Sequence, residues 1–227
     1  MTLDILYQDN HLIAVNKPFG LPTQSENKDD PSLLEQTREW IKTEFNKPGN
    51  VYLGLVHRLD QPVAGVVLFA RTSKAASRLS EQFRERTTQK VYRALVENKM
   101  EQASGTLTCY IKKEKKSLRA TVYPRPSPDA KEAELSYRVL KTFPKDKLDT
   151  CLLEVRPVTG RFHQIRAQLA SIKHPILGDV KYGARYPLQP DRQIALYACE
   201  LVFNHPVTGE RVTIEAPEPP GWPFLPA

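Results

Sequence analysis

Short segments of β-forming residues follow one another along most of this 227-residue chain, with only three stretches of helical spacing among them. The expected strands are 3–7, 11–16, 53–59, 63–71, 90–97, 106–112, 118–123, 133–142, 148–156, 195–204 and 211–216. The expected helices are 32–46, 73–86 and 162–172. Because strands and helices do not alternate regularly, we expect an α+β fold rather than a Rossmann fold or a TIM barrel. Its sheet would be large and mixed but mostly antiparallel, with a few flanking helices and a candidate lobe boundary at 141–149.

Membrane insertion and secretion have no support in the sequence. The longest apolar run, 63–70, is far shorter than the about 20 residues that span a bilayer. The N-terminus has no basic region followed by an apolar one, so we expect no secretory signal. The three cysteines are scattered and odd in number, which is typical of reduced thiols in a cytoplasmic protein.

Positive charge is concentrated in the middle of the chain. Residues 51–192 carry 27 Lys and Arg against 14 Asp and Glu, a net charge of +13, whereas 1–50 and 193–227 each carry −3. Such a block attracts polyanions through counterion release. The alternative is a solvated, lysine-rich surface, and charge alone does not decide between the two.

Common cofactor and hydrolase motifs are missing. The five histidines form no HExxH pair and the cysteines form no CxxC, so we expect no metal site. Neither GxxxxGK[ST] nor GxGxxG occurs, and the GxSxG of nucleophilic hydrolases is also missing. The usual hydrolases and nucleotide-dependent enzymes therefore have little support.

Two clusters of polar residues remain as candidate sites. The first, LVHRLDQPVAG at 55–65, places Asp60 and Arg58 in a loop between two apolar strands. The second, RPVTGRFHQIR at 156–166, places three arginines, a histidine and a glutamine at a helix entrance, where anions bind well. The alternatives are a turn capped by Asp60 beside a surface Arg58, and a well-capped basic helix.

Six motifs, in order along the chain, resemble those of the RluA-type pseudouridine synthases. They are NKPxGL at 16–21, HRLD at 57–60 with Gly65, QKVYRALV at 89–96, GRxHQIR at 160–166, HPIxGDxxYG at 174–183, and HP at 205–206 after a strand. One of these would be a weak match, but six in family order cover nearly the whole chain.

The resemblance implies an RNA-modifying isomerase that converts uridine to pseudouridine without a cofactor. Its substrate would be ribosomal or transfer RNA, and we expect a monomer. The fold implied is one catalytic domain over 1–227, with two lobes around a central cleft. Many relatives carry an additional S4-type RNA-binding domain, which we expect to be absent because the catalytic hairpin starts near Leu3.

The resemblance also assigns roles to particular residues. Asp60 would be the reacting carboxylate, Arg166 its partner, and Tyr92 a contact to the uracil and a candidate for a late proton transfer. An arginine partner keeps a carboxylate ionised in a closed site. The residues expected to contact RNA are Arg58, His57, Arg161, Gln164 and Ile165. Among these, Arg58 would fill the space left by a flipped base, Ile165 would form an apolar wall, and His57 would either contact RNA or brace the loop.

The sequence departs from the family pattern in the catalytic loop. Val63 and Ala64 stand where relatives usually have threonine and serine, so two hydroxyls are lost. This departure is the basis for one alternative, a non-catalytic RNA-binding protein on the same fold. A glycosidase-like hydrolase is a third reading, but it needs a second carboxylate, which neither cluster provides.

Overall fold

The computed structural model describes residues 3–25, 30–144, 149–189 and 193–222, and it divides into two compact units. Unit 1 comprises Met1–Gln89 and Ala198–Pro219, and unit 2 comprises Lys90–Tyr197 and Pro220–Ala227. The lobe boundary expected at 141–149 is therefore wrong, because this stretch belongs to unit 2; residues 145–148 lie outside the described part. Chain segments remote in sequence thus build each unit together.

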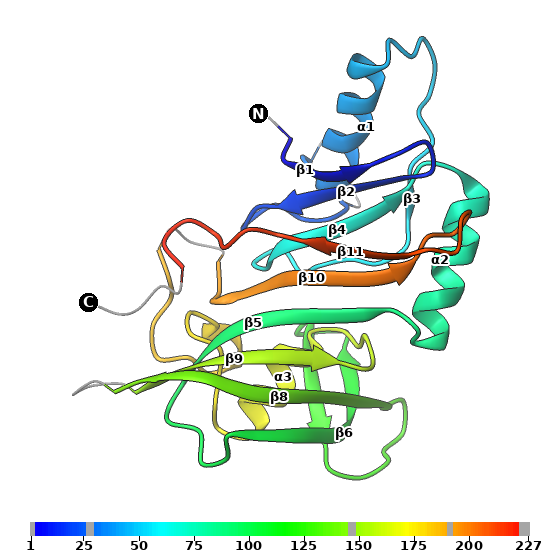
Figure 1. Cartoon of the computed structure of the whole chain (residues 1–227). Helices are drawn as coiled ribbons and strands as arrows, with labels where there is room; N and C mark the ends of the chain where they lie inside the picture. The colour runs from blue at the N-terminus through cyan, green and yellow to red at the C-terminus, as the bar shows by residue number, and fades with distance from the viewer. Residues whose placement is uncertain (1–2, 26–29, 145–148, 190–192, 223–227) are drawn as a thin grey trace. The chain divides into compact units, whose positions relative to one another are not determined.

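Unit 1 is built on a sheet whose strands follow the order β1, β2, β4, β10 (Figure 1). β3 pairs with β4 and β11 with β10, and the pairs β1–β2, β2–β4, β3–β4 and β10–β11 are antiparallel. The bounds are β1 (Ile5–Gln8), β2 (Leu12–Lys17), β3 (Gly54–Leu55), β4 (Ala64–Ala70), β10 (Leu196–Asn204, from Ala198 in this unit) and β11 (Arg211–Glu215).

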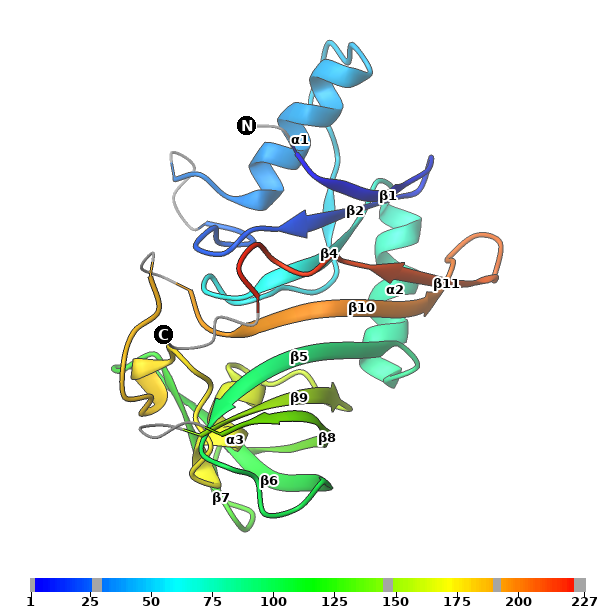
Figure 2. The same ribbon diagram turned by 60° about the vertical axis from the view of Figure 1, so that its left-hand side comes forward.

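Two capped helices accompany this sheet. In α1 (Leu33–Glu44), the side chain of Ser32 accepts a hydrogen bond from the Glu35 N–H and so caps the helix. In α2 (Ser73–Glu85), Thr72 accepts from the Ala75 N–H in the same way. α1 lies beside the β1–β2 edge in both views (Figures 1 and 2).

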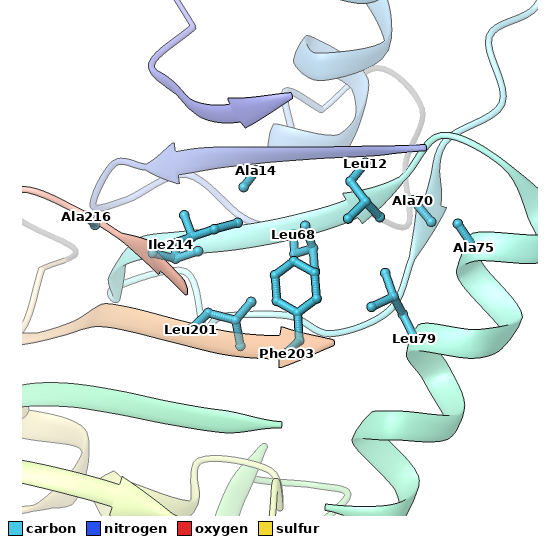
Figure 3. Packing of buried hydrophobic residues seen from close by; sticks show 11 residues of the cluster. Leu12, Ala14, Leu68, Ala70, Ala75, Leu79, Leu201, Phe203, Ile214 and Ala216 are labelled. Carbon is cyan, nitrogen blue, oxygen red and sulfur yellow. The ribbon is translucent and has the colours of Figure 1, made fainter. Parts of the chain in front are cut away.

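The core of unit 1 lies between α2 and the sheet (Figure 3). Leu68 of β4 and Phe203 of β10 are fully buried there, and Ala75 and Leu79 reach them from α2. This burial is the main source of stability for the strands that flank the 56–63 loop, since burying a large apolar side chain is worth about 1.5–3 kcal/mol.

Gly65 permits a close approach between β4 and β10. Its φ of +110° lies outside the region that residues with a side chain normally adopt, and a Cβ there would lie 2.1 Å from the carbonyl oxygen of Ala198. Only glycine fits, which explains this residue at the start of β4.

Unit 2 contains an antiparallel sheet in the order β5, β9, β8, β6, β7. Its strands are β5 (Gln89–Glu97, from Lys90 in this unit), β6 (Ser104–Glu114), β7 (Arg119–Tyr123), β8 (Lys131–Phe143) and β9 (Thr150–Pro157). The helix α3 (Gln164–Ser171) lies on one face of this sheet (Figures 1 and 2), where Gln168 donates to the Leu107 and Ala133 carbonyls. A short 3₁₀ helix, η1 (Val180–Tyr182), follows and buries Tyr182 against the same core.

These elements confirm the expected α+β class with a mostly antiparallel sheet. The three expected helices are present within about two residues of their predicted ends, as is usual for helix ends. The strand expected at 53–59 is reduced to Gly54–Leu55, because the chain leaves the sheet to form the loop that carries Asp60. None of the helices described is both long and apolar enough to cross a membrane.

Candidate active site

The loop that carries Asp60 is held by hydrogen bonds to its backbone groups. The Asp60 carbonyl accepts from the Val63 N–H at 3.0 Å, which closes a tight turn. The buried hydroxyl of Thr23 accepts from the Leu59 N–H at 3.1 Å and donates to the Leu59 carbonyl at 2.8 Å. Both backbone groups of Leu59, the N–H and the carbonyl, are therefore hydrogen-bonded just before Asp60. The Asp60 side chain itself stays half-buried.

Lys17 is a residue of this site that the sequence reasoning missed. Its side chain is fully buried, and Nζ donates to the carbonyls of Pro18 (2.9 Å), Leu21 (2.7 Å) and Gln61 (3.1 Å). It thus ties the end of β2 to the residue that follows Asp60. Burial lowers the pKa of Lys17 to about 7, and the charge of Asp60 opposes that shift. The NKPxGL motif at 16–21 contains Lys17 and is the signal that marks this residue in the sequence.

The apolar residues Val63 and Ala64 suit their positions. Both are 3% exposed, so a hydroxyl at either place would need a buried partner. The turn after Asp60 is closed by backbone groups instead. The loss of the two hydroxyls therefore leaves the loop's own hydrogen bonds intact.

His57 and Arg58 differ in their surroundings, although they are adjacent. His57 accepts the Leu68 N–H at Nε2 (2.9 Å), and its ring stacks on Phe83 with centroids 4.9 Å apart and planes 23° apart. Two alternative roles were expected for His57, contact with RNA and bracing of the loop, and these contacts favour bracing. Arg58 is exposed and is thereby accessible to a large ligand.

Gln164 organises the entrance to α3. Its side-chain oxygen accepts from the Thr159 hydroxyl (2.7 Å) and the Arg161 N–H (2.9 Å), and its nitrogen donates to the Glu134 carbonyl (3.0 Å). The side chain is 4% exposed. The geometry therefore gives Gln164 a role in shaping the loop, and the expected RNA contact stays a prediction. Arg161 is half-buried, with Nε donating to the Glu132 carbonyl at 2.8 Å.

Arg166 forms a buried, two-pronged ion pair with Asp179. Nε lies 2.7 Å from one carboxylate oxygen of Asp179, and Nη2 lies 2.9 Å from the other. Both side chains are almost completely buried, and the guanidinium carbon lies 5.0 Å from the centroid of the Tyr182 ring. This arrangement fixes the plane of the guanidinium.

Tyr92 and Ile165 complete the predicted set in unit 2. Tyr92 lies on β5 opposite Val155 of β9 and is half-buried. Ile165, in the first turn of α3, is 8% exposed. Tyr92 thus has the partial exposure that a contact to a nucleobase would require, whereas Ile165 is buried.

The predicted residues thus fall into two groups. Unit 1 contains Asp60, Arg58 and His57, to which the structure adds Lys17, and unit 2 contains Tyr92, Arg161, Gln164, Ile165 and Arg166. The pairing of Asp60 with Arg166 joins the two groups and stays a prediction. Within the described ranges, no group of three or more His, Cys, Asp or Glu side chains is placed to hold a metal ion.

Comparison with known proteins identifies relatives of both units. Residues 11–171 match the family model described as RNA pseudouridylate synthase. The dual-specificity RNA pseudouridine synthase RluA of Haemophilus influenzae is 34% identical over 217 residues, which are 94% of this chain and 92% of that protein. The tRNA pseudouridine synthase C of Vibrio parahaemolyticus is 33% identical over 98% of this chain and 93% of that protein. Among solved structures, human RNA pseudouridylate synthase domain containing 4 is similar with a TM-score of 0.79 and 27% identity, covering 96% of this chain and 89% of that one.

Proposed function

This chain belongs to the RNA pseudouridylate synthase family, and we propose that it converts specific uridines of structured ribosomal or transfer RNA to pseudouridine, with Asp60 as the reacting carboxylate. In this isomerisation the bond from the ribose C1′ to N1 of uracil breaks, the base turns, and a bond from C1′ to C5 forms. The C5 proton is released and N1 gains one, so atoms and charge balance without an oxidant, a reductant or a hydrolytic water.

The observation that carries the proposal is the rigid mounting of Asp60. Thr23, Lys17 and the Val63 N–H fix the backbone on both sides of this residue, while its carboxylate stays half-buried. A positioned carboxylate can attack carbon or remove a proton. The first step would be attack on the uracil, attack on the sugar or proton abstraction from the sugar.

Arg166 is the proposed partner of Asp60. Asp179 fixes the guanidinium of Arg166 through Nε and Nη2, and in this proposal the guanidinium so oriented pairs with Asp60. When one buried carboxylate already neutralises the charge of an arginine, that arginine offers a second carboxylate a weaker but well-oriented hydrogen-bond donor. In this proposal Asp179 is a positioning residue, because it acts through Arg166.

Three further side chains would hold the target base. A uridine within folded RNA must leave its stack before a buried carboxylate can reach it. The exposed Arg58 would occupy the vacated space, because guanidinium planes stack well on bases. The half-buried Tyr92 would lie against the uracil and Ile165 would form the apolar wall beside it.

The proposed class of RNA rests on relatives that are named for transfer RNA and relatives that are named for ribosomal RNA. Similar proteins carry the names dual-specificity RNA pseudouridine synthase, tRNA pseudouridine synthase and ribosomal large subunit pseudouridine synthase. We therefore expect the target among transfer and ribosomal RNAs. A map of pseudouridine in cellular RNA with and without this protein would identify the modified position.

The direct test is tritium release from RNA labelled at C5 of uridine, using bulk tRNA and fragmented rRNA. The wild-type protein is expected to release tritium, since the C5 proton must leave. Asp60→Asn keeps the size of the side chain but removes its charge, and should lower the rate at least about a hundredfold. Glu39→Gln, an exposed carboxylate on α1, is the matched control and should leave the rate unchanged.

Three other results would contradict the proposal. Absence of tritium release on every RNA pool would leave a non-catalytic RNA-binding protein. Appearance of free uracil would indicate hydrolysis of the glycosidic bond. An Asp60→Asn variant that is folded and fully active would place the reacting group elsewhere.

A further inference from the structure

We propose that Tyr186 stacks on an unpaired base of the RNA and so contributes to the choice of substrate. Tyr186 lies in the segment of residues 179–188 of unit 2, which we term the Tyr186 loop (gold in Figure 2). This inference rests on the proposed RNA substrate, but it concerns a residue outside the motifs and roles described above.

The Tyr186 ring is exposed to an unusual degree. Its exposed fraction of 68% is the highest among the large apolar side chains exposed in the described part of the chain. A single exposed apolar residue needs no explanation by itself. Here, however, the neighbouring Arg185 and Lys181 are also exposed, as is Val180. An aromatic ring beside cations is the combination that binds single-stranded RNA, by stacking on bases and by attracting phosphates.

The first half of the loop is anchored to the core of unit 2. The carbonyl of Asp179 accepts hydrogen bonds from the Tyr182 N–H (2.9 Å) and the Ala184 N–H (3.1 Å). The Tyr182 ring is buried, and its hydroxyl accepts from the Ala120 N–H of β7 at 2.7 Å. The exposed ring of Tyr186 therefore follows a well-fixed turn.

The second half is anchored on either side of Tyr186. The N–H of Arg185 donates to a carboxylate oxygen of Glu97 at 2.9 Å, and Glu97 is only 1% exposed. Leu188 packs so closely on Gly178 that a Cβ atom added to Gly178 would lie 2.6 Å from the Leu188 Cγ. Because the backbone is held before and after Tyr186, its ring can receive a base without ordering a loose segment, which is a large part of the cost of binding.

The loop also reaches the proposed catalytic machinery through Asp179. The same residue that begins the loop holds the guanidinium of Arg166 in its two-pronged ion pair. A base that stacks on Tyr186 would therefore be bound to the same fixed segment that orients Arg166. We expect Tyr186 to act on RNA binding, with KM changed and kcat preserved.

Binding to short RNAs tests this directly. Fluorescence anisotropy with a labelled oligouridine should show that Tyr186→Ala weakens binding at least about fivefold, the lower end of what stacking one base on an aromatic ring is worth. Tyr186→Phe keeps the ring and should bind within about twofold of the wild type. Tyr52→Ala is the matched control, because Tyr52 is 50% exposed in unit 1 and has no lysine or arginine within four residues. A fully paired RNA duplex should not distinguish Tyr186→Ala from the wild type, since its bases are already stacked.

The contact itself is tested by cross-linking oligouridine that contains 4-thiouridine to the wild-type protein. Mass spectrometry should find the cross-link on the peptide that contains Tyr186. Equal oligouridine affinity of folded Tyr186→Ala and wild type, or cross-links confined to other peptides, would overturn the proposal.

Failure of this inference is distinguishable from failure of the proposed function. If the wild type releases tritium from C5-labelled RNA and Tyr186→Ala has an unchanged KM, the isomerase stands and the Tyr186 contact is refuted. If no RNA pool yields tritium but Tyr186→Ala still weakens oligouridine binding, the contact is supported and the isomerase is refuted.

Discussion

Burying a lysine costs free energy, because its ammonium must leave water. Lys17 recovers part of that cost through three carbonyls within 3.1 Å, which match the three N–H donors of an ammonium. Two of those carbonyls, at Pro18 and Leu21, belong to the rigid loop after β2, and the third, at Gln61, belongs to the turn after Asp60. One side chain thus sets the distance between two loops that the sequence separates by more than 40 residues.

Replacing Lys17 with methionine should therefore affect both stability and activity. Methionine fills similar space but removes three hydrogen bonds to carbonyls, worth about 1 kcal/mol each, so the free energy of unfolding should fall by about 3 kcal/mol. We expect kcat to fall as well, because the Asp60 loop loses its brace. Urea unfolding and the tritium-release assay measure the two effects.

The control for this change is Lys42→Met on α1, where the lysine is exposed. It should alter the free energy of unfolding by less than about 0.5 kcal/mol. A Lys17→Met protein as stable and active as this control would show that Lys17 does not hold the loop.

Among the secondary-structure elements, β9 carries a carboxylate that links three strands of unit 2. Glu154 lies opposite Arg93 of β5 and Arg138 of β8, and its oxygens lie 2.6 Å and 3.3 Å from their guanidinium groups. Arg156 adds a third contact at 3.1 Å. Burial alone would raise the pKa of Glu154, but hydrogen bonds and charge from Arg93 and Arg156 lower it to about 2.

This shift predicts an acid-dependent contribution to stability. The folded pKa lies below the unfolded one, so Glu154 stabilises the fold fully above about pH 4.5 and progressively less as the pH falls toward 2. Glu154→Gln should lower the free energy of unfolding by about 2–3 kcal/mol at pH 7. Urea unfolding of both proteins between pH 7 and 3.5 should show the difference shrinking below pH 4.5. A difference that stays constant over this range would mean that the ionised carboxylate is not the stabilising group.

The contact between β4 and β10 predicts a severe effect of a single methyl group. Gly65→Ala adds a Cβ 2.1 Å from the Ala198 carbonyl oxygen at a φ of +110°, so both collision and backbone strain oppose it. We expect a loss of about 3 kcal/mol or more in the free energy of unfolding, measured by thermal or urea denaturation.

Gly183→Ala separates the two causes. Gly183 has a φ of +97°, but a Cβ there would meet nothing within 4 Å, so only the backbone strain of about 1–2 kcal/mol remains. Equal losses in the two variants would show that the collision with Ala198 contributes nothing.

At the scale of the whole molecule, the net positive charge of the chain belongs to one unit. Unit 2 has 21 Lys and Arg against 11 Asp and Glu, a net charge of +10, whereas unit 1 has 12 against 15, a net charge of −3. The basic block seen in the sequence therefore belongs mainly to the unit that contains α3, the Tyr186 loop and the β6–β7 hairpin. An RNA substrate would meet most of its phosphate contacts there.

Salt dependence measures how many of these charges contact phosphates. RNA affinity should fall as salt rises from about 50 to 200 mM, with each neutralised phosphate adding about 0.7–0.9 to the logarithmic slope. Lys115 and Lys116, exposed at the β6–β7 turn, are expected contacts, so the double change Lys115→Gln and Lys116→Gln should reduce the slope by about 1.4–1.8. Filter binding at a series of salt concentrations provides the measurement.

The matched control removes two exposed lysines of unit 1, Lys42→Gln and Lys47→Gln, and should leave the slope unchanged. An identical slope in both double variants would exclude the hairpin from the RNA contacts.

The sequence by itself determined what depends on neighbouring residues. Apolar spacing is a local signal, so the helices and most strands were predicted nearly to their ends. Motif spacing likewise placed Asp60 in a loop and Arg166 in the short helix α3. The 53–59 strand was the exception, because Leu59 is held by Thr23 rather than by a neighbouring strand.

Only the tertiary structure decided which distant groups meet. Lys17 and the Gln61 carbonyl, Arg166 and Asp179, and Glu97 and the Arg185 N–H are each brought together by packing, which sequence spacing does not encode. The same is true of the units, since the chain returns to unit 1 only at Ala198. Local propensity fixes backbone conformation over a few residues, whereas burial and hydrogen-bond satisfaction act between whatever segments the fold places side by side. For the same reason the sequence did not reveal which groups hold His57 and Gln164: the Leu68 N–H and the Phe83 ring contact His57, and the Thr159 hydroxyl and the Glu134 carbonyl bind Gln164.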